Sequence, residues 1–511
     1  MRNFLLSICF LTVAVSPAQN APLAWGDQGN GTYINPVLNA DYSDPDVIRV
    51  GDKYYMVASD FHFMGMQILE SPDMVNWRLI SQIYRRFDYP GWDDNRRYAG
   101  GSWAPAIRYH DGKFWVFFCT PDEGLFMTNA ENPAGEWSPL HPVKNVAKWE
   151  DPCPFWDDDG NAYLGRSIWG AGPIIIHKMS PDGKQLLDSG FTVYTGPVAE
   201  GTKIHKKDGY YYLSIPEGGV ERGWQTVLRS KNIYGPYEKK VVLEKGSTDV
   251  NGPHQGAMVD TPEGDWWFYH FRHAGTIGRV VHLQPMFWQD GWPVIGVDID
   301  RNGIGEPVYA WKKPVESDRI FLPQTGDNFD SAQLGLQWQW NHNPVNEAWS
   351  LSEKRGSLTL NALQSENFRL ARNTLTQKIM GYASEATIAV DISKIAEGQR
   401  CGMVCMGKEN KMLGIRMLNG KKEIYLSNDT TEVFVSNISK KVVYLRVTID
   451  ILKNRFHYSY SLDNQNFIPC GEVFEMRFGY WKGARFGLYC YNIEKAAGKA
   501  FFEEVRYEIR R

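Results

Sequence analysis

One short pattern occurs five times in the first part of the chain, and it limits the possible folds more than any other feature. In each copy a glycine next to an aspartate makes a turn, and a strand rich in aromatic residues follows at once. The glycines are 61, 48, 49 and 55 residues apart, at Gly51, Gly112, Gly160, Gly209 and Gly264. A period of about 50 residues with strand-type units is typical of stacked sheet modules, and a closed ring of them is a propeller. The sequence therefore predicts a five-bladed β-propeller over residues 30–310.

A second domain is expected because a chain of 511 residues is too long for one ordinary core. Residues 312–318 are polar and indicate a connector. From Asp327 onward, short alternating strands recur between turn residues, for example at 357–360, 387–390, 443–449 and 456–461. Such spacing predicts a β-sandwich over residues 325–511. The expected fold class is all-β.

Three carboxylates stand just ahead of the predicted blades. Asp44 and Asp151 each precede a proline, and Glu200 precedes a glycine. A following proline biases the backbone of the acid toward extended conformations. Each acid comes before the opening strand of a different blade, so the ring should bring all three near its axis. One such acid is more typical of a turn, but three at equivalent places favour the paired-carboxylate chemistry of glycoside hydrolysis.

Several further motifs follow in a fixed order, namely residues 35–51, Trp103-Ala104-Pro105, Pro216-Glu217-Gly218-Gly219, His254-Gln255-Gly256 and Asp290-Gly291-Trp292-Pro293. Together with the three acids, the series resembles glycoside hydrolase family 43, in its bacterial arabinofuranosidase and xylosidase branch with a C-terminal, jelly-roll-like β-sandwich. The resemblance covers residues 30–310 and more weakly the rest. Two positions depart from the family pattern, Thr202 where many members have proline and Val280 where xylosidases often have glutamate.

The resemblance implies a role for each acid in an inverting mechanism. Asp44 would be the general base that activates water, and Glu200 the general acid that protonates the leaving oxygen. Asp151 would orient Glu200 and raise its pKa by like-charge repulsion.

The resemblance also suggests residues that bind the sugar. Arg279 would reach the axis and pair with a sugar or with a catalytic carboxylate. Trp103 and Phe61, with Phe118 as a further candidate, would form an aromatic wall, unless they are core residues. Glu217 fits a rim contact and a packing role about equally well.

No cofactor is expected for catalysis. His254 matches a family histidine that lies close to a hydrated, structural cation. The sandwich could bind a structural calcium ion and lend a loop to the catalytic rim, or it could only brace the propeller.

The expected function is an exo-acting inverting hydrolase that releases terminal pentoses from plant cell-wall oligosaccharides, such as those of xyloglucan and arabinoxylan. The first interpretation is an α-L-arabinofuranosidase, and a β-D-xylosidase or a bifunctional enzyme is the alternative. A non-catalytic sugar-binding propeller would not need the three acids. A protein-interaction propeller would show signatures such as Trp-Asp in every repeat.

The N-terminus predicts export. Arg2 supplies a positive charge, residues 4–15 form an apolar run, and Ser16-Pro17-Ala18 is a small-residue cleavage site. Residues 1–18 are therefore expected to be a bacterial signal peptide, which implies a periplasmic or secreted protein. A net charge of −4 gives no nucleic-acid signal. No second apolar run of about 18 residues follows, so no membrane insertion is expected.

Overall fold

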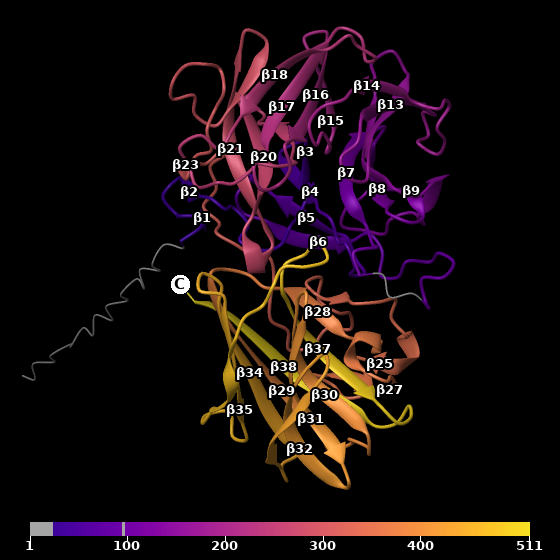
Figure 1. Cartoon of the computed structure of the whole chain (residues 1–511), viewed down its shortest axis with the longest axis vertical. Helices are drawn as coiled ribbons and strands as arrows, with labels where there is room; N and C mark the ends of the chain where they lie inside the picture. The colour runs from indigo at the N-terminus through magenta and orange to yellow at the C-terminus, as the bar shows by residue number, and fades with distance from the viewer. Residues whose placement is uncertain (1–23, 95–97, 511) are drawn as a thin grey trace, which may run out of the picture.

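The computed structural model describes residues 24–94 and 98–510 and shows two stacked bodies built almost wholly of strands (Figure 1). The predicted signal peptide at residues 1–18 lies outside the described residues. The helical segments among the described residues are three short 3-10 turns: η1 (Gly275–Ile277), η2 (Asn346–Ala348) and η3 (Phe368–Leu370). Within the described part of the chain, no helix is long and apolar enough to cross a membrane. The all-β fold class is confirmed.

Five antiparallel sheets of four strands each make up the first body. Blade one has β3 (Asp46–Val50), β4 (Lys53–Val57), β5 (Gln67–Ser71) and β6 (Arg78–Gln82). Blade two has β7 (Trp103–His110), β8 (Lys113–Thr120), β9 (Gly124–Ala130) and β10 (His141–Asn145). Blade three has β11 (Trp149–Trp156), β12 (Ala162–Ile168), β13 (Ile174–Met179) and β14 (Phe191–Tyr194). Blade four has β15 (Lys203–Lys207), β16 (Tyr210–Glu217), β17 (Trp224–Ser230) and β18 (Glu238–Leu243). Blade five has β19 (Met258–Asp260), β20 (Trp266–His273), β21 (Arg279–Gln289) and β22 (Trp292–Ile295).

The repeated glycine turn is the hairpin between the first and second strands of every blade. Gly51, Gly112, Gly160, Gly209 and Gly264 all have positive φ values, between 64° and 92°, which a glycine adopts without steric cost. The aromatic strand that follows is the second strand of its blade, and its rings pack in the core between neighbouring sheets. The sequence pattern therefore marks the same hairpin five times.

The first strands of the blades lie around the axis of the ring. β3 contacts β7 and β19, and β11 contacts β7 and β15. The first and fifth blades are joined by an ion pair of 2.7 Å between Arg49 on β3 and Asp260 on β19. The chain ahead of β3 also pairs with the fifth blade, because the amide of Val37 donates to the carbonyl of Val281 at 2.8 Å. These contacts close the five-bladed propeller that the sequence predicts.

The second body consists of two stacked sheets, in which all strand pairs except that of β27 with β37 are antiparallel. The first has β24 (Gln339–Trp340), β27 (Leu363–Gln364), β28 (Leu375–Lys378), β30 (Gln399–Met406), β31 (Asn410–Leu418), β32 (Lys421–Asn428), β33 (Glu432–Asn437) and β37 (Arg485–Asn492). The second has β25 (Trp349–Ser350), β26 (Leu358–Asn361), β29 (Ala383–Asp391), β34 (Val442–Asp450), β35 (Arg455–Ser461), β36 (Ile468–Phe474) and β38 (Lys499–Arg510). In β34, buried and half-buried residues alternate, as expected for a strand with one face on a core. The predicted β-sandwich is confirmed.

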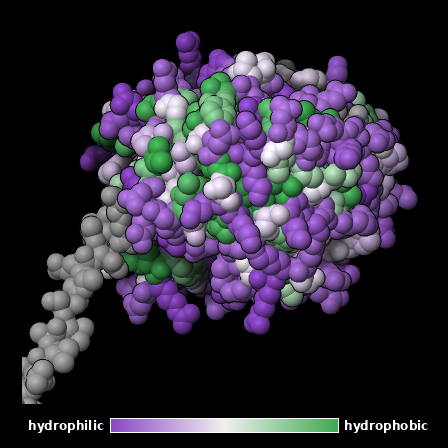
Figure 2. Space-filling view, turned by 90° about the horizontal axis from the view of Figure 1, so that it is seen from below, coloured by the Kyte–Doolittle hydropathy of each residue, from purple (hydrophilic) through white to green (hydrophobic). Residues whose placement is uncertain are grey.

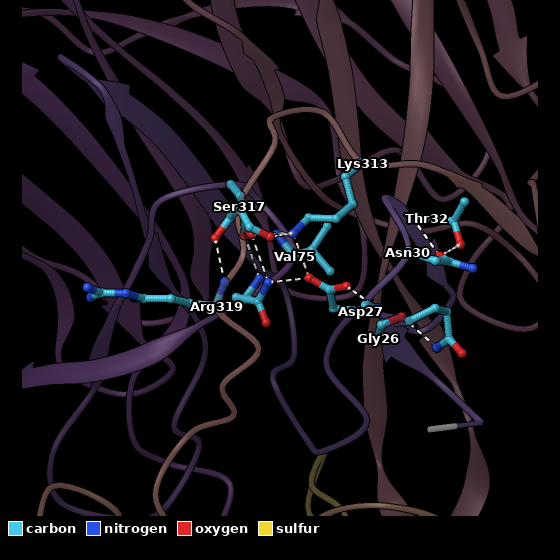
Figure 3. A network of polar contacts seen from close by, with 12 residues as sticks. Gly26, Asp27, Asn30, Thr32, Val75, Lys313, Ser317 and Arg319 are labelled. Carbon is cyan, nitrogen blue, oxygen red and sulfur yellow. Dashed lines mark hydrogen bonds and ion pairs between the residues drawn. The ribbon is translucent and has the colours of Figure 1, made fainter. Parts of the chain in front are cut away.

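The connector between the two bodies is fixed by a buried lysine rather than left free (Figure 3). Lys313 follows β23 (Ala310–Lys312), which pairs with β2 (Thr32–Ile34), and β2 pairs in turn with β1 (Gly26–Asp27). Its ammonium group lies 2.6 Å from Asp27 and 2.9 Å from Asp73. It also donates to the carbonyl of Ser317 at 3.1 Å. One lysine thus joins the N-terminal strand, the first blade and the connector.

The surface at the sandwich end is mostly hydrophilic, with limited hydrophobic areas between the polar side chains (Figure 2). Scattered exposed apolar residues of this kind are normal for a globular protein.

Candidate active site

A cavity of about 290 Å³ opens at one end of the propeller axis, and every blade contributes to its wall. Each blade places a non-glycine residue with a positive φ there, at Asp44 (53°), Ala104 (36°), Asp151 (55°), Val198 (54°) and Gln255 (43°), and the third blade adds Ala171 (60°). Left-handed backbone costs roughly 1–2 kcal/mol for an L-residue, and strain of this kind gathers at functional sites. The expected extended backbone at Asp44 and Asp151 is therefore wrong. The tight turn at the pocket end of the strand outweighs the bias from the following proline.

The carboxylate of Asp44 is surrounded by donors. Its Oδ2 accepts hydrogen bonds from the hydroxyls of Ser43 at 2.8 Å and Ser59 at 2.6 Å. Its Oδ1 lies 3.2 Å from Nη1 of Arg279, which also donates to Ser43 at 2.8 Å. An ionised carboxylate is an acceptor only, and these donors match that form. Ser59 is itself positioned by the amide of Ala104 at 2.7 Å.

Asp151 lies inside β11 at a bulge, and not ahead of the strand as the sequence predicts, because the β11–β12 register shifts between Glu150 and Cys153. Bulges near active sites re-aim side chains. Asp151 Oδ2 accepts from the Ser167 hydroxyl at 2.6 Å and the Gly201 amide at 2.8 Å. Its Oδ1 accepts from Gln255 at 3.0 Å. The Gly201 contact ties Asp151 to the residue that follows Glu200.

The expected pKa relation between Asp151 and Glu200 is reversed. Burial, followed by repulsion from Glu200, raises the pKa of Asp151 to about 6. Burial also acts to raise the pKa of Glu200, but it is outweighed by a hydrogen bond from His254 and by the charges of His254 and Arg279, so this pKa is lowered. Nε2 of His254 lies 3.0 Å from Glu200 Oε1. His254 stabilises the negative charge on Glu200. The repulsion between the two carboxylates therefore raises the pKa of Asp151 rather than that of Glu200.

The other predicted binding residues divide into two groups. Phe61, Trp103 and Arg279 line the cavity together with the three acids and His254. Glu217 does not, because its carboxylate contacts Tyr194 of the third blade at 2.8 Å and Lys239 of the fourth blade at 2.9 Å. Of the two roles considered for Glu217, these contacts therefore favour packing over a rim contact. Phe118 stacks on Phe126 in the core, with ring centroids 5.6 Å apart.

The cavity wall also contains residues that sequence reasoning did not select, among them Glu150, Trp169 and Trp481. Glu150 directly precedes Asp151 in the sequence, and this position beside a catalytic candidate is the available signal. Trp169 is 51% exposed and packs edge-on against Trp103. Trp481 belongs to the sandwich, far away in sequence, and no local pattern marks it. Its presence favours the rim role for the second domain.

The predicted cation near His254 stays a prediction. Nε2 of this ring faces Glu200, and its Nδ1 has no hydrogen-bond partner among residues 24–94 and 98–510. One oxygen of each of Glu150, Asp151 and Glu200 lies within 4.8 Å of the others. The predicted calcium ion in the sandwich likewise stays a prediction.

Comparison with known proteins agrees with this geometry. The family model of glycosyl hydrolases family 43 matches residues 33–293, and the model of the beta xylosidase C-terminal concanavalin A-like domain matches residues 326–508. A putative beta-xylosidase of Xylanibacter ruminicola is 59% identical over 91% of this chain and 87% of its own. A beta-xylosidase of Formosa agariphila is 38% identical over 93% and 90%.

Two further matches are a relative named as an arabinofuranosidase and a solved structure. A non-reducing end alpha-L-arabinofuranosidase of Bacteroides ovatus is 32% identical over 64% of this chain and 65% of its own. A solved bifunctional GH43-CE protein of Bacteroides eggerthii has a TM-score of 0.83 and 29% identity, and the match covers 94% of this chain and 64% of that one. With catalytic-domain and C-terminal-domain models matched in order, and a relative at 59% identity, the chain belongs to glycoside hydrolase family 43 and is a glycosidase.

Proposed function

We propose that the protein is an exo-acting β-D-xylosidase that releases terminal xylose with inversion of configuration. The observation that carries this proposal is that Asp44, Asp151 and Glu200 line the same cavity. Its volume of about 290 Å³ is at the lower end of the range for ligand pockets, which suits one sugar residue. The relatives named as beta-xylosidases, at 59% and 38% identity, support the choice of sugar.

The roles of the acids follow from their surroundings. Asp44, held by two hydroxyls and Arg279, would accept a proton from the attacking water. Glu200 would protonate the leaving oxygen. Asp151 lies beside Glu200, and the charge of Glu200 raises the pKa of Asp151. His254 stabilises the charged form of Glu200, so Glu200 must take up its proton against this effect before it acts as the acid.

An α-L-arabinofuranosidase is the second candidate, and it was the first interpretation of the sequence. The Bacteroides ovatus relative supports it. Arabinofuranose and xylopyranose are both pentoses. A pocket that fits either sugar would leave no room for the additional carbon of a hexose. We put the xylosidase first because the two beta-xylosidases support it with larger identity and coverage.

The proposal includes the compartment and the source of the substrate. The N-terminal sequence supports export from a bacterial cell, and a terminal-pentose pocket suits short oligosaccharides from plant hemicellulose. No cofactor is part of the proposed mechanism.

Product analysis tests the proposal. With xylotetraose, chromatography of early time points should show xylose and xylotriose only, and proton NMR should show α-xylose as the first-formed anomer. Early xylobiose in place of free xylose would rule out exo-action, and first-formed β-xylose would rule out inversion.

A further inference from the structure

Glu150 is a carboxyl group in the cavity wall that the inverting mechanism does not use. It precedes Asp151 on β11 and pairs with Ser167 of β12. The residue is buried among protein atoms and still lines the cavity. It lies on the side of the acid pair that faces the Trp169–Ala171 loop, because the amide of Ala171 donates to its Oε1 at 3.3 Å.

The other oxygen of Glu150 is available to a ligand. Among the described residues, no hydrogen bond to Oε2 is found, and Oε2 is not one of the buried atoms that lack a partner. It therefore borders the open cavity. Trp169 and Ala171 line the cavity beside it, so an oxygen of a bound sugar can approach it.

The surroundings of Glu150 disfavour a negative charge. An oxygen of Asp151 and one of Glu200 each lie within 4.8 Å of it, and three carboxylates at such distances cannot all ionise. Among the described residues, Asp151 accepts three hydrogen bonds and Glu150 accepts one. Glu200 is stabilised by His254 and Arg279. Arg166 of the neighbouring strand stacks over Trp149, 3.5 Å from the ring centroid. Glu150 therefore takes up a proton before its two neighbours do, and Glu200 needs a second proton to act as the general acid.

We propose that Glu150 is a specificity-determining residue that binds the terminal sugar as a neutral carboxylic acid, with its free oxygen donating a hydrogen bond to a sugar hydroxyl. The pKa agrees with this role: burial, and then the charges of Asp151, Glu200 and Asp44, raise the pKa of Glu150 to about 9. A neutral donor adds binding without placing another negative charge beside the acid pair. The inference rests on the proposed pentose pocket and adds one recognition contact to it.

The test compares Glu150→Gln with Glu150→Ala. Glutamine keeps a neutral donor and the acceptor for Ala171, and alanine keeps neither. D-Xylose and L-arabinose serve as probes, and their dissociation constants are read from the fluorescence of the tryptophans in the wall. We expect Glu150→Ala to weaken binding of the preferred pentose about tenfold, the size of one lost hydrogen bond. Glu150→Gln should recover most of this, to within about threefold of the parent protein.

Two readouts separate recognition from a structural role. The parent protein should lose pentose affinity above pH 9 as Glu150 ionises, and Glu150→Gln should not. Among aryl pentosides that each lack one hydroxyl, one analogue should be cleaved with the same kcat/KM by the parent and by Glu150→Ala. A uniform loss on all analogues, or a Glu150→Gln variant as weak as Glu150→Ala, would overturn the proposal.

The binding measurements with D-xylose and L-arabinose do not depend on which pentoside the protein hydrolyses. If neither xyloside nor arabinofuranoside were cleaved while the affinities followed the expected order, the proposed function would fail and the role of Glu150 would stand. If xyloside were cleaved but Glu150→Ala bound pentose as well as the parent, only the role of Glu150 would fail.

Discussion

The carboxylate of Asp41 accepts a hydrogen bond from the backbone amide of Gly483 at 2.9 Å, which joins the propeller to the turn that carries Trp481. Its other oxygen accepts from the amide of Arg279 at 2.8 Å. One buried side chain therefore sets the position of two cavity residues from different domains. Tyr480 and Trp481 both have positive φ values, 58° and 61°, as in a tight turn of type I′.

Asp41→Ala should lower kcat/KM without abolishing it. Both amides lose their acceptor, so Arg279 and Trp481 shift, and misplacement by about 1 Å can cost up to about 10²-fold. We expect a loss of about tenfold or more on an aryl xyloside. Thr276→Val is the matched control, because it removes another contact between the domains, to the carbonyl of Met476 at 2.9 Å, away from the cavity wall. Equal effects of the two variants on kcat/KM would contradict the positioning role of Asp41.

Asp44→Asn should remove turnover and leave the fold intact. The amide cannot take a proton from water, and general-base catalysis contributes about 10²–10⁴-fold. The measurement is kcat on an aryl xyloside, together with Tm. Asp52→Asn, at an exposed turn position on the same blade, is the control and should behave like the parent. Near-normal turnover by Asp44→Asn would show that another group is the base.

Glu200→Gln should discriminate between leaving groups. A natural xyloside needs a proton on its leaving oxygen, whereas a dinitrophenolate leaves without one. We expect the variant to lose at least about 10²-fold on xylobiose and much less on 2,4-dinitrophenyl β-D-xyloside. The ratio of kcat/KM values for the two substrates is the readout. A parallel loss on both substrates would argue against Glu200 as the general acid.

Much of the architecture could be predicted because it repeats. The glycine turns at Gly51 and Gly160 mark the same hairpin in different blades, so one local pattern reports the whole ring. The acids were found for a related reason: each precedes or lies in an opening strand, and the ring brings those strands together.

The remaining site features depend on contacts that no local pattern carries. Trp481 reaches the cavity only because the sandwich docks on the propeller, through Asp41 and Gly483. The left-handed backbone of Asp151 results from a strand bulge that overrides the preference of a residue before proline. The reversed titration of Asp151 and Glu200 depends on His254, a residue on another blade.

Glu150→Gln should change the pH dependence of stability. The pKa of Glu150 is raised from 4.5 to about 9 in the folded protein, so between these values the folded state holds a proton that the unfolded state has lost. The contribution of Glu150 to the free energy of unfolding is therefore complete below pH 4.5 and falls as the pH rises toward 9. Relative to the parent, the Tm of Glu150→Gln should rise between pH 4.5 and pH 8.

The control for this prediction is Glu347→Gln, at an exposed position in the sandwich. Its difference in Tm from the parent should stay constant over the same pH range. A constant difference for Glu150→Gln as well would mean that Glu150 ionises in the folded protein as it does in the unfolded chain.

The most direct test of the central claim is the ratio of kcat/KM for 4-nitrophenyl β-D-xyloside to that for 4-nitrophenyl α-L-arabinofuranoside, with the β-D-galactoside as a hexose control. We predict that the xyloside is preferred by more than about tenfold, which is about 1.4 kcal/mol of transition-state binding, and that the galactoside is not cleaved. A ratio of one or below would contradict the xylosidase assignment and make the protein an arabinofuranosidase.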